Sequence, residues 1–266
     1  MTTPIAVTIA GSDSGGGAGI QADLKTFSAL GVYGASVIAA LTAQNTRGVT
    51  GIHDVPASFV AAQMDAVFSD LDVRAVKIGM LSNPDAIEAV AAGLERHGQR
   101  KVVLDPVMVA ASGDRLLSPD AVETLRTKLI PRALLVTPNL PEAAAILETA
   151  MAQTESEMRE QGEKILALGA RAVLVKGGHG SGAESVDILV EPNAVARLAA
   201  GRIDTRNTHG TGCTLSSAIA AGLAKNLDLN ESVREAKAYV TAAIAASDRL
   251  AIGKGHGPVH HFHRWW

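Results

Sequence analysis

The sequence predicts an α/β fold of three layers, with helices on both faces of a mainly parallel central sheet. Short apolar runs rich in β-branched residues alternate along the chain with alanine- and leucine-rich stretches at helical spacing. This is the β-α-β order of a parallel sheet. Aromatic residues make up only 3% of the chain and glycine occurs 26 times, a composition that suits close packing of helices on a sheet.

The expected strands are continuous apolar runs, the pattern of strands that are buried on both faces. These runs are residues 5–10, 37–41, 75–78, 101–104, 134–137 and 172–175. The expected helices have apolar residues at helical spacing, and one begins with Ser118 and Pro119, an N-cap followed by proline at the first helical position. They are residues 18–30, 58–68, 84–97, 118–129, 141–147, 156–168, 211–225 and 231–249. Residues 185–190 and 195–198 are expected to form a late antiparallel pair.

Length, charge and hydropathy exclude several classes of protein. The 266 residues are 47% hydrophobic and contain no evident linker or repeat, so we expect one domain over residues 1–266. The net charge of −3 argues against a nucleic-acid partner, and no apolar run approaches the length of a membrane span. The N-terminus does not resemble a signal peptide, and a single cysteine excludes an internal disulfide, so we expect a cytoplasmic protein.

Glycines and polar residues follow the expected strands one after another. They are residues 11–19, Gln44, Gly79 with Met80, Asp105, Asn139 and Lys176. Ligands of open α/β sheets bind beyond the carboxyl ends of the strands. We therefore expect these residues to surround one cleft.

The glycine-rich loop at residues 11–19 invites a dinucleotide-binding interpretation. The strict G-x-G-x-x-G pattern fails because Ile20 stands where the third glycine belongs. The relaxed pattern fits Gly17, Gly19 and Ala22, but no acidic residue ends the second strand to hold a ribose. The P-loop pattern also fails. Either the loop is only a tight turn or it lets a ligand approach the backbone, and the number of glycines favours the ligand.

A second glycine-rich segment, NTHGTGCT at residues 207–214, runs into an expected helix. Gly210 and Gly212 leave backbone N–H groups uncovered at the helix N-terminus, and with the helix dipole these groups form an anion site suited to a phosphate in transit. Cys213 lies in the first turn, where the dipole favours the thiolate. A lone cysteine is usually a small buried apolar residue, but its place between glycine and threonine favours a role in the site.

Seven segments carry a resemblance along the whole chain: residues 10–30, 41–46, 77–81, 137–143, 175–179, 207–215 and 255–266. They resemble, in the same order, the hydroxymethylpyrimidine/phosphomethylpyrimidine kinases of thiamine biosynthesis. This family is part of the ribokinase-like superfamily, whose anion-hole motif resembles the GTGC at residues 210–213. The resemblance implies a ribokinase-like α/β/α sandwich, a homodimer, and ATP-dependent phosphorylation of a hydroxymethyl group and then of the resulting monophosphate.

The resemblance also implies how the phosphates are bound. The backbone at Gly210, Thr211 and Gly212 would hold the transferring phosphoryl group, and Lys176 would offer its ammonium to the phosphates of ATP. Phosphoryl transfer depends mainly on positioning and on neutralising charge, which these groups supply. The alternative for Lys176 is a solvated lysine at a strand end.

Asn139 and Glu142 resemble the superfamily's Asn-x-x-Glu motif, whose glutamate helps to hold Mg²⁺. Asn139 is assigned to the nucleotide site, and Asp105 could supply a second oxygen ligand to the metal. The alternatives are a strand-end cap for Asp105 and a helix first-turn acid for Glu142. Cys213 occupies the position where sugar kinases of the superfamily carry an aspartate base, and a thiolate there could accept the substrate proton. The loose transition state of phosphoryl transfer needs little proton removal, so this role stays open.

The pyrimidine is expected opposite the anion site. The amide of Gln44 has an acceptor and a donor that complement the amino group and ring nitrogen of an aminopyrimidine. The resemblance adds Asp23, Met80 and Gly11 to the substrate site, with the backbone at Val107 as a further wall. The alternatives are a helix-surface position for Asp23 and a core position for Met80.

Three further features have two interpretations each. The tail GHGPVHHFHRWW holds four histidines but no cysteine or carboxylate. We therefore expect Trp265 and Trp266 to pack the end of the chain against the body or a subunit partner, rather than a metal site. Lys237 could reach the nucleotide, although a solvated helix face is favoured. His209 either touches phosphate or shapes its turn.

Two other functions compete with a pyrimidine kinase. A pyridoxal or pyridoxine kinase would act on another flat heteroaromatic hydroxymethyl compound, and Gln44 argues for the aminopyrimidine instead. A binding module without catalysis would have no need of Asp105, Glu142, Lys176 and Cys213 together.

Overall fold

The structure is a computed structural model, and it describes residues 2–108, 117–178 and 182–266. A nine-stranded sheet has the order β3-β2-β1-β4-β5-β6-β7-β8-β9. Six neighbouring strands are parallel: β2, β1, β4, β5, β6 and β7. Antiparallel strands extend the sheet at both ends, with β3 at one end and β8 and β9 at the other. The strands are β1 (Ile5–Gly11), β2 (Tyr33–Asn45), β3 (Gly48–Asp54), β4 (Ala75–Ile78), β5 (Val102–Leu104), β6 (Leu135–Val136), β7 (Val173–Lys176), β8 (Glu184–Glu191) and β9 (Ala194–Gly201).

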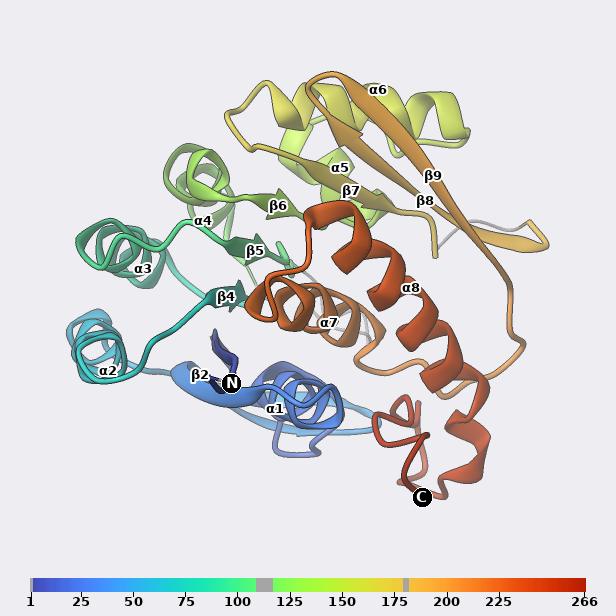
Figure 1. Cartoon of the computed structure of the whole chain (residues 1–266), viewed down its shortest axis with the longest axis horizontal. Helices are drawn as coiled ribbons and strands as arrows, with labels where there is room; N and C mark the ends of the chain where they lie inside the picture. The colour runs from blue at the N-terminus through green and yellow to red at the C-terminus, as the bar shows by residue number, and fades with distance from the viewer. Residues whose placement is uncertain (1, 109–116, 179–181) are drawn as a thin grey trace.

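Helices cover both faces of this sheet, so the predicted three-layer fold is confirmed (Figure 1). One apolar core lies under α2 (Ala57–Phe68), α3 (Pro84–Arg96), α4 (Pro119–Thr124), α5 (Leu140–Leu147) and α6 (Glu155–Leu166). The other core lies under α1 (Gly19–Ala29), α7 (Thr211–Ala224) and α8 (Leu229–Ala245). The expected helix at residues 118–129 changes to a π turn at Leu125–Leu129, followed by a 3₁₀ turn at Ile130–Arg132.

The sheet differs from the prediction at its first edge. Strand β2 continues to Asn45 and pairs with β3, which the sequence analysis did not predict. Most of β3 is exposed, and its sequence, GVTGIHD, has no continuous apolar run that would reveal a strand. Gln44 therefore lies within β2, at a register shift of the β2–β3 pair, and the prediction that it follows the second strand is wrong.

Helix α7 is the central helix of its layer, and most of its side chains are small. Every residue from Thr214 to Ala224 is buried. A Cβ atom added at Gly222 would lie 2.7 Å from Oγ of Ser232, so this glycine lets α8 pack closely against α7. The close packing brings the N-terminus of α7 over the carboxyl ends of the parallel strands.

The C-terminal tail packs against the body of the protein through residues 258–261, all of which are buried. His260 N–H donates to the carbonyl of Ala243, and Tyr239 Oη donates to the carbonyl of His261 at 2.6 Å. Trp265 and Trp266 are 69% and 64% exposed, so they are not buried against the body. The ring of Trp266 lies on those of His260 and Phe262 in the same tail, and packing of the tryptophans against a subunit partner stays a prediction. Among the described residues, no group of three or more histidine, cysteine or carboxylate side chains is placed to hold a metal ion.

His261 makes the stability of the protein depend on pH. Burial, assisted by the nearby Lys25 and His260, lowers the pKa of His261 to about 3. Its imidazole is therefore neutral in the folded protein and takes up a proton only on unfolding, so stability is full above pH 6.5 and falls as the pH drops below it. Between pH 7.5 and 5 we expect this residue to cost about 2 kcal/mol. Urea unfolding at both pH values measures the loss, which should be about 2 kcal/mol smaller in His261→Gln than in the wild type, and equal losses would contradict the assignment.

Candidate active site

A cleft of about 780 Å³ lies at the carboxyl ends of the parallel strands. It is large enough for a nucleotide and a small second substrate. The predicted site residues that line it are Gly11, Gln44, Met80, Asp105, Val107, Asn139, Glu142, Lys176, Gly210, Thr211, Gly212 and Cys213. The cleft at this edge of the sheet thus brings together twelve of the thirteen candidate residues, which come from seven different segments of the chain.

The N-terminus of α7 forms one wall of the cleft. Its N-cap, Gly210, has a φ of 80° and no side-chain cap. A Cβ at this position would lie 1.9 Å from the carbonyl oxygen of Gly17, so only glycine fits. The first amides of a helix have no acceptor within the helix. The N–H of Thr211 donates to the carbonyl of Thr208 at 3.2 Å, and the cleft receives the amides that follow it in the first turn, together with the positive end of the α7 dipole.

A cluster of buried charges lies beside these amides. Lys176 Nζ is 2.8 Å from Oδ1 of Asp105 and 3.9 Å from Oε2 of Glu142. Asp105 also accepts hydrogen bonds from Thr137 Oγ1 and Ser216 Oγ, at 3.1 and 3.2 Å. Although burial by itself raises the pKa of Asp105, the charge of Lys176 and other neighbours holds that pKa below its usual value. Asp105 is therefore an anion at neutral pH.

Glu142 is placed by a reciprocal cap at the start of α5. Its N–H donates to Oδ1 of Asn139, and its carboxylate accepts from the N–H of Asn139, both at 2.8 Å. Burial raises the pKa of Glu142 to about 7, against the opposing effect of Lys176. Two carboxylates suit Mg²⁺ bound together with substrate phosphates, because this ion usually takes only one or two carboxylates from the protein.

Cys213 is not the thiolate that its place in the helix predicted. Burial raises the pKa of its thiol to about 11, more than the charge of Lys77 lowers it. Asp23 and Asp105 raise the pKa further. The helix dipole is a small effect beside the cost of desolvating the anion, so the thiol is protonated at neutral pH.

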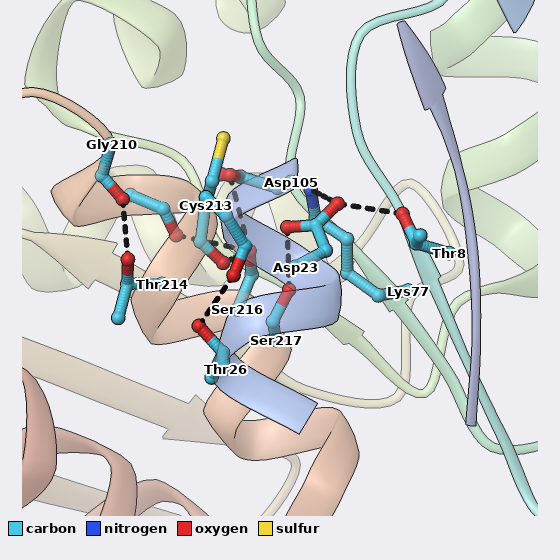
Figure 2. A network of polar contacts seen from close by, with 12 residues as sticks. Thr8, Asp23, Thr26, Lys77, Asp105, Gly210, Cys213, Thr214, Ser216 and Ser217 are labelled. Atoms are coloured by element: carbon cyan, nitrogen blue, oxygen red, sulfur yellow. Dashed lines mark hydrogen bonds and ion pairs between the residues drawn. The ribbon is translucent and has the colours of Figure 1, made fainter. Parts of the chain in front are cut away.

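A second ion pair lies beneath the cleft (Figure 2). Lys77 Nζ is 2.8 Å from Oδ2 of Asp23, and both side chains are fully buried. Thr8 and Ser217 donate to the same carboxylate, each at 2.6 Å. Asp23 therefore joins β1, β4 and α7 and does not line the cleft, so its position does not support the expected contact with substrate.

The buried ion pair of Lys77 with Asp23 was not predicted from the sequence. The lysine stands inside the strand sequence AVKI, whose four residues are all buried. A charged residue on a strand that is covered on both faces requires a buried partner. A lysine inside an apolar strand was therefore the sequence signal for this buried ion pair.

The candidate substrate residues Gly11, Gln44, Met80 and Val107 line the same cleft. Oε1 of Gln44 accepts a hydrogen bond from Thr42 Oγ1 at 3.1 Å. Met80 packs against Gly11, where an added Cβ would lie 2.6 Å from the Met80 methyl group. Val107 lies on the same cleft beside the strand end that carries Asp105.

Lys237 does not have the solvated position favoured above. Its Nζ lies 2.8 Å from Oδ2 of Asp187, and the lysine side chain is only 12% exposed. Oδ1 of Asp187 accepts from the N–H of Gly177, the residue that follows Lys176. Lys237 and Asp187 therefore help to hold the end of β7.

The protonated thiol can be observed directly, because Cys213 is the only cysteine in the chain. With a pKa of about 11 instead of 9, the thiolate fraction at pH 7.5 is about 100-fold lower than for an ordinary cysteine. We expect the rate of alkylation by iodoacetamide to rise about tenfold per pH unit up to pH 9.5 without a plateau. A plateau near pH 7 would show a thiolate.

Comparison with known proteins places this cleft in a family. The sequence pattern described as phosphomethylpyrimidine kinase matches residues 13–260. A hydroxymethylpyrimidine/phosphomethylpyrimidine kinase of Rhizobium meliloti is 67% identical over 99% of both chains. One of Salmonella typhimurium is 58% identical over 98% of both.

Solved structures share the fold over most of the chain. A phosphomethylpyrimidine kinase of Clostridium difficile is 48% identical, with a TM-score of 0.80 over 90% of this chain and 99% of its own. A pyridoxal kinase of Bacillus subtilis, solved as an ADP complex, is 37% identical with a TM-score of 0.92 over the whole of both chains. The identity over nearly the whole chain and the shared fold lead to one conclusion: this chain is a kinase of the phosphomethylpyrimidine kinase family.

Proposed function

We propose that the enzyme transfers the γ-phosphoryl group of ATP to 4-amino-5-hydroxymethyl-2-methylpyrimidine, and then phosphorylates the monophosphate to the diphosphate, in thiamine biosynthesis. The observation that carries this proposal is the arrangement of one cleft: Gln44 lies on one wall, and the uncapped amides of α7 lie on another with Lys176. The similarity to hydroxymethylpyrimidine/phosphomethylpyrimidine kinases supports the same substrates.

Gln44 orients the pyrimidine. Its amide offers both an acceptor and a donor to the amino group and ring nitrogen of the substrate. Met80 and Val107 provide an apolar surface for the flat ring. This placement directs the hydroxymethyl group toward the start of α7.

The phosphoryl group is bound by the backbone at Gly210, Thr211 and Gly212, and Lys176 neutralises its charge. A Cβ at Gly212 would lie 3.3 Å from Nζ of Lys176, so the absence of a side chain keeps that space open to the phosphate. Preorganised N–H groups and one ammonium stabilise the charge that spreads over the transferring oxygens. Asn139 fixes Glu142 at the edge of this site.

Asp105 and Glu142 are the residues that would hold Mg²⁺, whose charge supplies further neutralisation of the phosphates. The pKa of about 7 at Glu142 leaves this carboxylate partly protonated until a cation compensates for its burial. Cys213 donates or accepts a hydrogen bond as a thiol. Since the loose transition state needs little proton removal in advance, the substrate proton can leave late.

A pyridoxal kinase is the alternative function. The shared fold with the Bacillus subtilis pyridoxal kinase favours it, whereas Gln44 favours an aminopyrimidine. We further propose that the enzyme is a single domain, acts in the cytoplasm and forms a homodimer. Among the described residues, no helix is long and apolar enough to cross a membrane.

Release of ADP with Mg-ATP tests the substrate when hydroxymethylpyrimidine, its monophosphate and pyridoxine are offered in turn. We expect turnover with both pyrimidines, and turnover with pyridoxine alone would assign the vitamin B6 reaction.

In Gln44→Ala, we expect the KM for the pyrimidine to rise about 10- to 100-fold, because a pair of hydrogen bonds is lost, while the KM for ATP changes less than about threefold. Equal changes in both KM values would remove Gln44 from the substrate site.

Lys176→Ala and Glu142→Gln test the phosphoryl site. Each removes a group that acts on charge in the transition state, so we expect kcat to fall at least about 100-fold. Lys164→Ala and Glu160→Gln, on the exposed face of α6, are matched controls and should keep wild-type turnover. Thermal unfolding shows whether each variant is folded. Near-normal kcat in both site variants would overturn the assignment.

A further inference from the structure

The loop after β1 and the turn before α7 are joined by one carboxylate. Oδ2 of Asp13 accepts hydrogen bonds from the N–H groups of Gly17 and Ala18, at 3.0 and 2.8 Å. Oδ1 accepts from the N–H of Gly15 at 2.8 Å. Nε2 of His209 is also 2.8 Å from Oδ2. Asp13 therefore organises its own loop and at the same time bonds to the residue that precedes Gly210.

The two segments also touch through their backbones. A Cβ at Gly17 would lie 2.4 Å from Cδ2 of His209, and a Cβ at Gly210 would lie 1.9 Å from the oxygen of Gly17. No side chain separates the loop from the turn. A shift of one segment by the width of a methyl group would therefore have to move the other.

The ring of His209 has little freedom. Its backbone N–H donates to Gly257, and its carbonyl accepts from the N–H of Val259, at 3.0 and 3.2 Å. The side chains of His209 and Asp13 are only 9% and 2% exposed. The C-terminal tail thus fixes the backbone of His209, while Asp13 fixes its ring.

The direction of the His209–Asp13 hydrogen bond follows from the other partners of Asp13. Against the effect of burial, the hydrogen bond with His209 and those from backbone amides hold the pKa of Asp13 below its usual value. An ionised carboxylate only accepts, so Nε2 of His209 carries the hydrogen.

We propose that Asp13 and His209 are positioning residues for phosphoryl transfer, which hold the loop after β1 and the anion site before α7 at one fixed separation. The inference rests on the proposed function for its kinetic part. The loop joins Gly11 at the end of β1 to Gly19 at the start of α1, both of which line the cleft, and the turn carries Gly210 of the anion site. Nucleophile and phosphoryl group approach correctly only when both walls are in register, and a displacement near 1 Å can cost about 100-fold in rate.

The test compares His209→Ala, His209→Gln and Asp13→Asn with the double variant Asp13→Asn/His209→Ala. We expect His209→Ala to lower kcat about 100-fold and to raise the KM for the pyrimidine, with the KM for ATP changed less than about threefold. His209→Gln places an amide donor near the position of Nε2 and should recover kcat to within about tenfold of wild type. The double variant should be no slower than the slower single variant, because both changes break one interaction.

His97 provides the matched control. Its Nε2 lies 2.8 Å from Oδ1 of Asp65, the same pairing at the same distance, between α2 and the residue that caps the end of α3. His97→Ala and His97→Gln should leave kcat and both KM values unchanged. A kcat of His209→Ala within about threefold of wild type, or no recovery in His209→Gln, would overturn the proposal. Multiplying effects in the double variant would instead indicate that His209 acts directly on the phosphate.

Hydrogen exchange gives a readout that does not depend on turnover. Peptides covering residues 12–18 should exchange faster in His209→Ala than in the wild type and in His97→Ala. The reason is that Asp13, which accepts hydrogen bonds from the amides of this loop, loses its bond to His209. Unchanged exchange there would contradict the proposal even if turnover fell. If the wild type shows this protection but phosphorylates no pyrimidine, the proposed function fails while the coupling of the two segments stands.

Discussion

The close approach of the α7 N-terminus to the strand ends is the constraint on which the cleft depends. Helix α7 can reach this place because its residues are small and buried from Thr214 onward. At Gly210 the backbone of α7 meets the backbone of the loop after β1, so a side chain there would push the two segments apart. The uncapped amides are available to a phosphate only because nothing fills this space.

Opposite charges make the buried floor of the cleft possible. Lys77 pairs with Asp23 beneath it, and Lys176 pairs with Asp105 beside it. An isolated buried charge is very costly, and removing one partner of a buried pair destabilises a protein by about 3–5 kcal/mol. The same pairing connects strands and helices that lie far apart in the sequence, since Asp23 binds side chains from β1, β4 and α7.

The chemistry of the site follows from burial as much as from residue type. Burial raises the pKa of the Cys213 thiol to about 11 and that of Glu142 to about 7. The first value removes the thiolate that the helix dipole alone would favour. Under the proposed function, the enzyme relies on binding and neutralising the phosphoryl group, which suits a transition state with little covalent participation by the protein.

The sequence by itself determined the fold class, the positions of the parallel strands along the chain and most of the residues that line the cleft. Continuous apolar runs and glycine-rich turns are local patterns, and the carboxyl ends of parallel strands necessarily share an edge. Local pattern did not reveal β3, because an exposed edge strand needs no apolar run.

Only the tertiary structure decided the role of Asp23, the protonation of Cys213 and the partnership of Asp13 with His209. Each depends on groups distant in sequence, such as Asp13 and His209, whose sequence separation is 196. Desolvation and pairing are properties of the packed interior, so a residue's charge state and partner become defined only when the chain has folded.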